Sequence, residues 1–341
     1  MLPQLFSIDW SPTLPRILPL SRYIEGVRTG SRSILARAIT LIESQRIDDQ
    51  KHAQELIHAL LPFAGTSLRI GISGLPGVGK STLLDTLGMF LIDKGHRVAV
   101  LAVDPSSNLG GGSILGDKTR MHRLSHSPSA YIRPSPSGKN LGGVAKKTRE
   151  AIVICEAAGF DIIFVETVGV GQSEIAVSNM VDCFVALMLP GGGDELQGIK
   201  KGVLERADII AINKADAERM VLARATLREH RAALRYLRKR HSCWNPTAIA
   251  ISAQTGMGIS DFWELICAHQ EAMHSSGTHT LLRQDQQSHW MWDIIFQQLH
   301  DQFLHHDKVR SFLPQIEESV RKGSISARAG AQHLLSLFSF Q

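Results

Sequence analysis

The sequence predicts an α/β fold with a mostly parallel central sheet flanked by helices, and with helical extensions at both ends. Two observations support this. Short strand-like apolar runs alternate with helical patterns over residues 67–272, as they do in repeated βαβ units. Residues outside that range carry apolar side chains at helical spacing. We therefore expect an N-terminal helical extension over 1–66, a nucleotide-binding domain over 67–272 and a C-terminal helical dimerisation arm over 273–341.

The most specific motif is Gly-Leu-Pro-Gly-Val-Gly-Lys-Ser at residues 74–81, which matches the pattern GxxxxGK[ST]. It follows the strand-like run 68–73 and precedes a helical pattern. Glycines in this setting let backbone N–H groups surround a phosphate, Lys80 adds a positive charge, and the Ser81 hydroxyl can ligate Mg²⁺. The fold is thus predicted to be that of a P-loop NTPase. The residues expected to bind the nucleotide here are Gly74, Leu75, Pro76, Gly77, Val78, Gly79, Lys80, Ser81 and Thr82.

A second motif indicates which base is bound. The apolar run 207–212 ends in Asn-Lys-Ala-Asp, an NKxD sequence. The Asp216 carboxylate can accept two hydrogen bonds from guanine, whereas adenine would leave this desolvated carboxylate unpaired. A further strand-like run ends in Ser252-Ala253-Gln254, where the Ala253 N–H can meet guanine O6. We expect Asn213, Lys214, Asp216, Ser252, Ala253 and Gln254 to contact the base.

Carboxylates follow two further strand-like runs. Residues 97–103 end at Asp104, and residues 161–165 end at Glu166-Thr-Val-Gly169. Parallel strands place ligands at their carboxyl ends, so Asp104 and Glu166 are expected to face Mg²⁺, and Gly169 can donate its N–H to the γ-phosphate. No glutamine directly follows Gly169. Gln172 is either a substitute for the usual water-orienting residue or an ordinary loop residue. Slow intrinsic hydrolysis that a partner accelerates is expected.

Composition and charge exclude several classes. No apolar run approaches the length of a bilayer span, and no basic segment with an apolar stretch opens the chain, so we expect a soluble, unexported, cytoplasmic protein without membrane contact. Four separated cysteines without a CxxC pair indicate buried thiols rather than zinc. The net charge of +5 is concentrated in an amphipathic basic helix over 218–240, whose basic face we expect to be solvated, with no nucleic-acid partner.

The flanking segments are predicted to be helical. Residues 23–46 and 52–61 form two helices in this prediction, and a polar break at Ser275–Thr278 precedes a long apolar helix. At least one more helix is expected after Pro314. An apolar helical tail cannot bury itself alone, and this favours a homodimer. The histidines of this tail lack cysteine or carboxylate companions at ligand spacing, so we expect them to be solvated; they are His289, His300, His305 and His306.

Together these motifs resemble the MeaB/ArgK family, the GTPase chaperones of adenosylcobalamin-dependent methylmalonyl-CoA mutase. The resemblance covers residues 20–330. Its motifs are the phosphate loop with Thr82, Ala-Val-Asp-Pro-Ser-Ser (102–107), Gly-Asp-Lys-Thr-Arg-Met (116–121), Glu-Thr-Val-Gly-Val-Gly-Gln-Ser-Glu (166–174), Gly-Asp-Glu-Leu-Gln-Gly-Ile-Lys-Lys-Gly (193–202) and Asn-Lys-Ala-Asp. Gly192 departs from many relatives.

The resemblance implies roles for individual residues. Asp104, Asp117 and Glu166 would be the Mg²⁺ and switch carboxylates, together with Ser81 as a metal ligand. The residues it implies in catalysis and its coupling are Lys80, Glu166, Asp194, Gln197 and Lys200, the last three in a third switch. It implies GTP as substrate, Mg²⁺ as cofactor, adenosylcobalamin only through the partner enzyme, and methylmalonyl-CoA mutase and a second copy of the chain as partners.

Three alternatives stay open from the sequence. A metallochaperone-type GTPase for another metalloenzyme would need a cysteine or histidine metal site. A transport-associated kinase of the lysine/arginine/ornithine type would transfer phosphate to a protein. An RNA-associated GTPase would bind through the basic helix, with a steep salt dependence.

Overall fold

The computed structural model describes residues 17–44, 46–103, 121–134, 141–167, 172–191, 201–236 and 239–338. The chain divides into two compact units, Met1–Thr280 and Leu281–Gln341. In the described residues, no helix combines the length and the apolar character that crossing a membrane requires.

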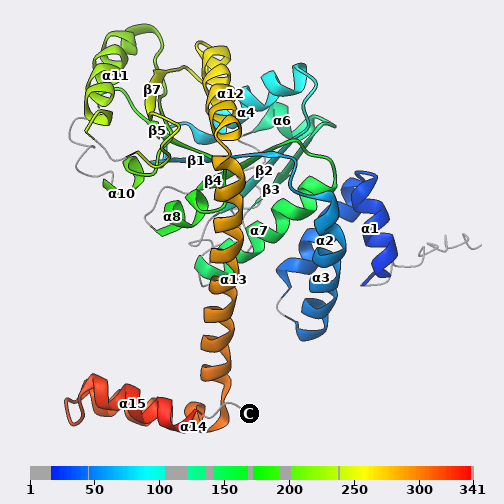
Figure 1. Ribbon diagram of the computed structural model, residues 1–341, viewed down its shortest axis with the longest axis vertical. Helices are drawn as coiled ribbons and strands as arrows, with labels where there is room; N and C mark the ends of the chain where they lie inside the picture. Colours follow the sequence, from blue (N-terminus) through cyan, green and yellow to red (C-terminus); the bar gives the residue numbers. More distant parts are fainter. Residues whose placement is uncertain are drawn as a thin grey trace, which may run out of the picture. The chain divides into compact units, whose positions relative to one another are not determined.

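The first unit is built on a seven-stranded sheet in which every strand pairs in parallel with its neighbours (Figure 1). Its order is β3-β2-β4-β1-β5-β6-β7. The strands are β1 (Leu68–Gly74), β2 (Val98–Val103), β3 (Ala130–Arg133), β4 (Ile162–Thr167), β5 (Cys183–Met188), β6 (Ile209–Ile212) and β7 (Thr247–Ala250). The predicted α/β class with a parallel sheet is confirmed. The four-residue edge strand β3 was not predicted, because so short a run carries little pattern.

Helices cover both faces of the sheet, and the strands alternate between two cores. In β2, Val98 and Val100 belong to one core, while Ala99 and Leu101 belong to the other. The first core packs under α4 (Lys80–Asp93), α6 (His122–His126) and α12 (Ile259–Ser275). The second packs under α7 (Leu141–Ala157), α8 (Gln172–Ser178) and the N-terminal helices. A sheet buried on both faces explains why its strands read as continuous apolar runs.

The N-terminal extension has three helices: α1 (Leu20–Arg28), α2 (Arg32–Glu43) and α3 (Ile47–Leu60), followed by the 3₁₀ turn η1 (Leu61–Phe63). The prediction of one helix over 23–46 is therefore wrong. The chain turns at Gly30, whose φ of 71° is in the left-handed region. Contacts between α2 and α7 and between α3 and α7 join this extension to the sheet layer.

The basic segment forms a 3₁₀ turn, η3 (Ala217–Arg219), and the helix α11 (Met220–Leu234), preceded in the chain by the short α10 (Lys201–Leu204). The helix ends earlier than the predicted residue 240. Arg240 leaves the basic face altogether: its Nη1 lies 2.9 Å from Asp208 Oδ2 and its Nη2 donates to Ser178 O. Part of the excess positive charge of this segment is therefore paired inside the fold.

The second unit is helical. The division from the first unit falls within α13 (Thr278–His305), which begins after α12 ends at the predicted polar break. α14 (Asp307–Arg321) and α15 (Ala327–Leu337) follow, with a small core around Val309, Ile316 and Leu334. The helix expected after Pro314 is α15, and Pro314 itself lies inside α14. A proline there removes one N–H donor but leaves the rest of the helix bonded.

Candidate functional site: a nucleotide pocket at the carboxyl edge of the sheet

The phosphate loop joins β1, which lies between β4 and β5, to the start of α4. β1 is therefore at a topological switch point, because the chain places later strands on both of its sides. Ligands of α/β proteins bind beyond the carboxyl ends of the strands at such points. Gly77 and Gly79 have φ angles of 79° and 98°, which glycine adopts without steric cost. A Cβ on Gly79 would also lie 2.5 Å from Asn213 Nδ2, so this position requires glycine for a second reason.

Lys80 and Ser81 open α4 directly below this loop. Lys80 is buried, and its Nζ donates to Gly74 O at 2.7 Å and to Leu75 O at 3.2 Å. The ammonium group is thereby held inside the loop whose N–H groups would bind phosphate. The Ser81 hydroxyl donates to Glu166 Oε1 at 3.4 Å, which brings together two oxygen groups from α4 and the end of β4. Hydroxyl and carboxylate oxygens are the ligands that Mg²⁺ prefers, so these two residues fit a magnesium site.

Asn213 joins three loops. Its Nδ2 donates to Val78 O in the phosphate loop at 2.9 Å, and its Oδ1 accepts a hydrogen bond from Ala253 N at 2.9 Å. The side chain is buried, and both its nitrogen and its oxygen are hydrogen-bonded, so the loops that follow β1, β6 and β7 are held together. The Ala253 N–H that the sequence analysis assigns to guanine O6 is engaged with Asn213, so binding of O6 requires this donor to be shared or released.

Two further contacts shape the base pocket. Ser252 Oγ donates to Asp216 Oδ2 at 2.7 Å, which orients this carboxylate. Lys214, whose φ of 60° is unusual for a residue with a side chain, donates from Nζ to Gly77 O at 2.7 Å. A pocket of about 490 Å³ lies here. It is lined by Gly79, Thr82, Asn213, Lys214, Asp216, Glu218, Arg219, Ala253 and Gln254. Loops distant in sequence thus converge on one cavity of the size of a small-molecule site.

Residues that the sequence analysis did not assign also support the site. Thr86 on α4 donates to Ala253 O at 2.7 Å and fixes the base loop from the phosphate side. A buried chain of hydrogen bonds runs from Thr167 Oγ1 to Ser73 Oγ and from Ser73 Oγ to Glu174 Oε1, each 3.0 Å long. It connects the ends of β4 and β1 to α8. Thr167 and Glu174 belong to the family motif at residues 166–174, and this motif could have indicated a role for them.

Several predicted site residues lie outside the described part of the chain: Asp104, Asp117, Gly169, Asp194, Gln197 and Lys200. Gln172 is the first residue of α8. The segment that carries the expected third switch leaves the described region after Gly191, whose N–H donates to Thr226 Oγ1 on α11 at 2.9 Å.

Comparison with known proteins places this geometry in context. The model of one family, described as methylmalonyl Co-A mutase-associated GTPase MeaB, matches residues 35–308. A relative from Caulobacter vibrioides, named only as a GTPase, is 52% identical over 309 residues, which are 91% of this chain and 94% of that protein. The mouse mitochondrial methylmalonic aciduria type A homolog is 45% identical over 94% of this chain and 79% of its own length. A crystal structure titled as an LAO/AO transport system kinase superposes with a TM-score of 0.75 at 36% identity, covering 93% of this chain and 96% of that one.

Proposed function

The chain belongs to the MeaB family and is a P-loop GTPase, and from this premise we propose that it gates the loading of adenosylcobalamin into methylmalonyl-CoA mutase and protects that enzyme. GTP is its substrate, and the bond it cleaves is the β–γ phosphoanhydride. The observation that carries the base assignment is the pairing of Asp216 with Ser252 beside Asn213, which aims a carboxylate into the pocket. The description of the matching family supports the mutase as partner.

The predicted site residues have definite parts in this proposal. Asp216 accepts the two guanine hydrogen bonds, one on each carboxylate oxygen, while Ser252 also donates to its Oδ2 and orients it. Lys80 moves from the carbonyls of Gly74 and Leu75 to the β- and γ-phosphate oxygens. Ser81 and Glu166 hold Mg²⁺, with Asp104 and Asp117 as further carboxylates. When bound, the metal neutralises charge that develops on the phosphate oxygens.

The hydrogen-bond chain Thr167–Ser73–Glu174 supplies a route by which the γ-phosphate affects distant parts of the protein. Glu166 and Thr167 end β4, and Ser73 directly precedes the phosphate loop. A movement of Thr167 on hydrolysis would therefore act on α8 through Ser73 and Glu174. Asp194, Gln197 and Lys200 belong to the third switch in this proposal. This segment would also change on GTP hydrolysis and would transmit the change to the mutase.

A second copy of the chain is the other proposed partner. α13 exposes large apolar side chains in the second unit: Phe296 is 63% exposed, Leu281 61% and Trp292 50%. Such a row of side chains on one helix is typical of an association surface. Sedimentation of wild type should give a dimer, and Phe296→Lys should shift it toward monomer more than Gln298→Lys, which adds the same charge to another exposed position on α13.

The experiment that tests the mutase assignment measures GTP turnover with and without saturating methylmalonyl-CoA mutase, apo and adenosylcobalamin-loaded. We expect acceleration by the mutase and GTP-dependent control of cofactor transfer. A second experiment does not assume the partner: GTP-loaded protein captures binding partners from a cytoplasmic extract, and mass spectrometry identifies them. Recovery of a different metalloenzyme, or transfer of labelled phosphate to a protein, would replace the mutase by one of the alternative functions and leave the GTPase assignment in place.

A further inference from the structure

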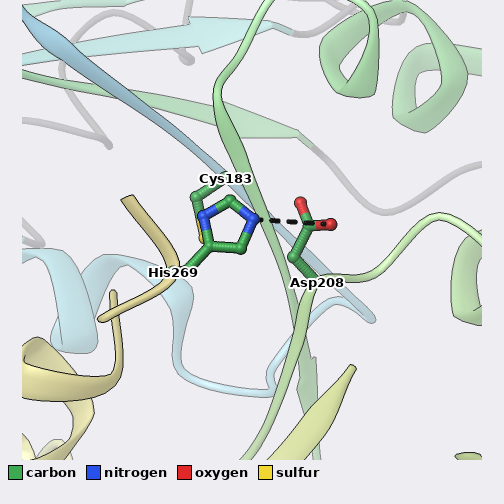
Figure 2. Close-up of side chains that lie close together, drawn as sticks. All are labelled: Cys183, Asp208 and His269. Carbon is green, nitrogen blue, oxygen red and sulfur yellow. Dashed lines mark ion pairs between the residues drawn. The ribbon is translucent and has the colours of Figure 1, made fainter. Parts of the chain in front are cut away.

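A buried cluster of chemically reactive side chains lies away from the nucleotide pocket. Cys183 is the first residue of β5, Asp208 directly precedes β6, and His269 is on α12 (Figure 2). The phosphate and base loops follow the carboxyl ends of β1 and β6, whereas Cys183 and Asp208 stand at amino ends. Since all seven strands are parallel, the cluster occupies the opposite edge of the sheet from the nucleotide.

The three side chains are arranged as a set of metal ligands. One ligand atom from each of Cys183, Asp208 and His269 lies within 4.8 Å of the other two, and all three residues are buried. His269 Nε2 is 3.8 Å from Asp208 Oδ1, and His241 Nε2 is also 3.8 Å from the same oxygen. A hydrogen bond would be about 2.7–3.2 Å long, so neither contact is one. Ligands of a tetrahedral Zn²⁺ ion, with bonds of about 2.0–2.3 Å, stand about 3.3–3.8 Å apart.

Four nitrogen and oxygen atoms of Asp208, His241 and His269 lack hydrogen-bond partners within the described part of the chain. They are Asp208 Oδ1, His241 Nε2 and both ring nitrogens of His269. Leaving several such atoms unsatisfied in a protein interior is costly, and native structures rarely do so without a bound water or ion. Asp208 Oδ2, in contrast, is fully used, because it accepts hydrogen bonds from the Phe184 N–H and from Arg240. Arg240 thus orients the carboxylate and leaves Oδ1 for another ligand.

The charges of this ligand set suit a divalent cation, because one thiol and one carboxylate can supply two negative charges to it. A divalent cation would replace the thiol proton, which leaves to solvent, and the thiolate and carboxylate would then balance its charge while Arg240 remains paired with Asp208.

We propose that Cys183, Asp208 and His269 bind one borderline divalent transition-metal ion of the Zn²⁺ and Co²⁺ class. His241 lies outside this set of three, with its Nε2 3.8 Å from Asp208 Oδ1, and would turn toward the ion as the fourth ligand. A sulfur, two nitrogens and one carboxylate oxygen select this class over Mg²⁺, which prefers oxygen alone. The ion joins α12 and the segment at His241 to the starts of β5 and β6. It is a structural site, independent of the proposed mutase function, and its ligands lie too far apart in sequence to form a recognisable motif.

Cobalt titration of the full-length, chelator-treated, nucleotide-free protein tests the site. We expect one equivalent of Co²⁺ to give the intense visible bands of tetrahedral coordination together with a thiolate-to-cobalt charge-transfer band, and Zn²⁺ to abolish both by competition. Ions bound by Ser81 and Glu166 would be oxygen-ligated and would give neither signal. Absence of these bands, or binding through weak octahedral absorption only, overturns the proposal. In that case a buried water satisfies the cluster.

Matched variants assign the ligands. Cys183→Ala should remove the charge-transfer band and weaken Co²⁺ binding by at least about 100-fold, more than the loss of a supporting residue causes. Cys155→Ala is the control, because Cys155 is an equally buried free thiol on α7 outside the cluster. Both are made in a Cys243→Ser, Cys267→Ser background, which removes the two less buried thiols.

If Cys183→Ala fails to fold, His241→Gln serves instead, with the buried His230→Gln on α11 as its control. Zn²⁺ should raise the melting temperature of wild type and of His230→Gln, and should raise that of His241→Gln much less. An equal Zn²⁺ response in wild type, His241→Gln and His230→Gln contradicts the proposed ligand set.

Discussion

The side-chain amide of Asn213 donates to Val78 O and accepts from Ala253 N, each across 2.9 Å, so one residue fixes the phosphate loop against the base loop. Gly79 lies against this amide, with space for no side chain. The distance between the sites for the base and for the phosphates is therefore set before GTP binds. A preformed spacing of this kind lowers the entropic cost of binding a nucleotide in one geometry.

The two glycines of the loop allow a matched test of this relationship. Gly77→Ala and Gly79→Ala both place a side chain at positive φ, but only the second brings Cβ within 2.5 Å of Asn213 Nδ2. We expect Gly77→Ala to lower the free energy of unfolding of the nucleotide-free protein by about 1 kcal/mol. Gly79→Ala should cost about 3 kcal/mol, because the Asn213 hydrogen bonds are lost as well. Urea unfolding measures both, and equal losses would contradict the proposed contact.

Asp216→Ala should remove base discrimination. Two hydrogen bonds to a charged acceptor are lost, so the affinity for GTP is expected to fall by roughly 100-fold or more, while that for ATP changes little. Glu218→Ala is the control, since Glu218 is another carboxylate in the lining of the same pocket. Calorimetric titration of both nucleotides distinguishes the two outcomes. If GTP and ATP weaken equally in Asp216→Ala, the carboxylate does not read the base.

Some parts of the fold and of the site could be predicted from the sequence, and others could not. The loops at 74–81, 213–216 and 252–254 carry chemistry in contiguous residues, and the α/β pattern fixes that they meet at the carboxyl edge. The helix break at Gly30 was missed because the apolar spacing continues across it. The cluster of Cys183, Asp208 and His269 was also missed, since only the completed sheet and α12 bring these residues together. Local pattern therefore predicted which loops converge on one pocket and could not predict contacts made by the tertiary fold.

Lys80→Ala should lower the rate of GTP hydrolysis by at least about 100-fold without unfolding the protein. Its ammonium group donates to two carbonyls of the phosphate loop, Gly74 O and Leu75 O, so the substitution acts on this loop. Lys94→Ala, at the other end of α4, is the control for loss of a lysine. Turnover is measured by phosphate release, and circular dichroism checks the fold. Wild-type turnover in a folded Lys80→Ala protein would disprove the phosphate-loop role.

Glu150 on α7 makes stability depend on pH. Burial raises the pKa of its carboxyl group from 4.5 to about 7, and Lys146 and Lys147 offset this only in part. Between these two values the folded state retains a proton that the unfolded state has lost, so the free energy of unfolding falls as pH rises and the full cost is present above pH 7. Glu150→Gln should therefore stabilise the protein at pH 8, by roughly 3 kcal/mol at most, and hardly at all at pH 4.5.

Chemical unfolding at both pH values measures this effect. Glu229→Gln, at an exposed position on α11, should produce no comparable gain at pH 8. A gain for Glu150→Gln that is equal at pH 4.5 and pH 8 would show that the effect arises from packing and not from ionisation.

The proposed third switch would couple GTP hydrolysis to the mutase. Asp194, Gln197 and Lys200 recur every three residues, so a helical turn would place them on one face, directed toward the nucleotide or the partner. The segment starts at Gly191, which Thr226 on α11 holds, and it ends where α10 begins at Lys201. Because the residues on its two sides contact α11 and begin α10, a change in this segment would act on both helices. Lys200 would supply a cation for the charge that develops on the γ-phosphate.

We expect Lys200→Ala to leave GTP binding and slow basal hydrolysis nearly intact while acceleration by the mutase falls about tenfold or more, the effect of about 1.4 kcal/mol in a transition state. Lys201→Ala, one residue further along and at the start of α10, is the matched control and should keep normal acceleration. The measurement is GTP turnover with and without saturating mutase. A Lys200→Ala protein that the mutase stimulates as strongly as wild type would show that coupling passes through another element. The hydrogen-bond chain Thr167–Ser73–Glu174 is then the next to test, because it links the γ-phosphate side of the pocket to α8.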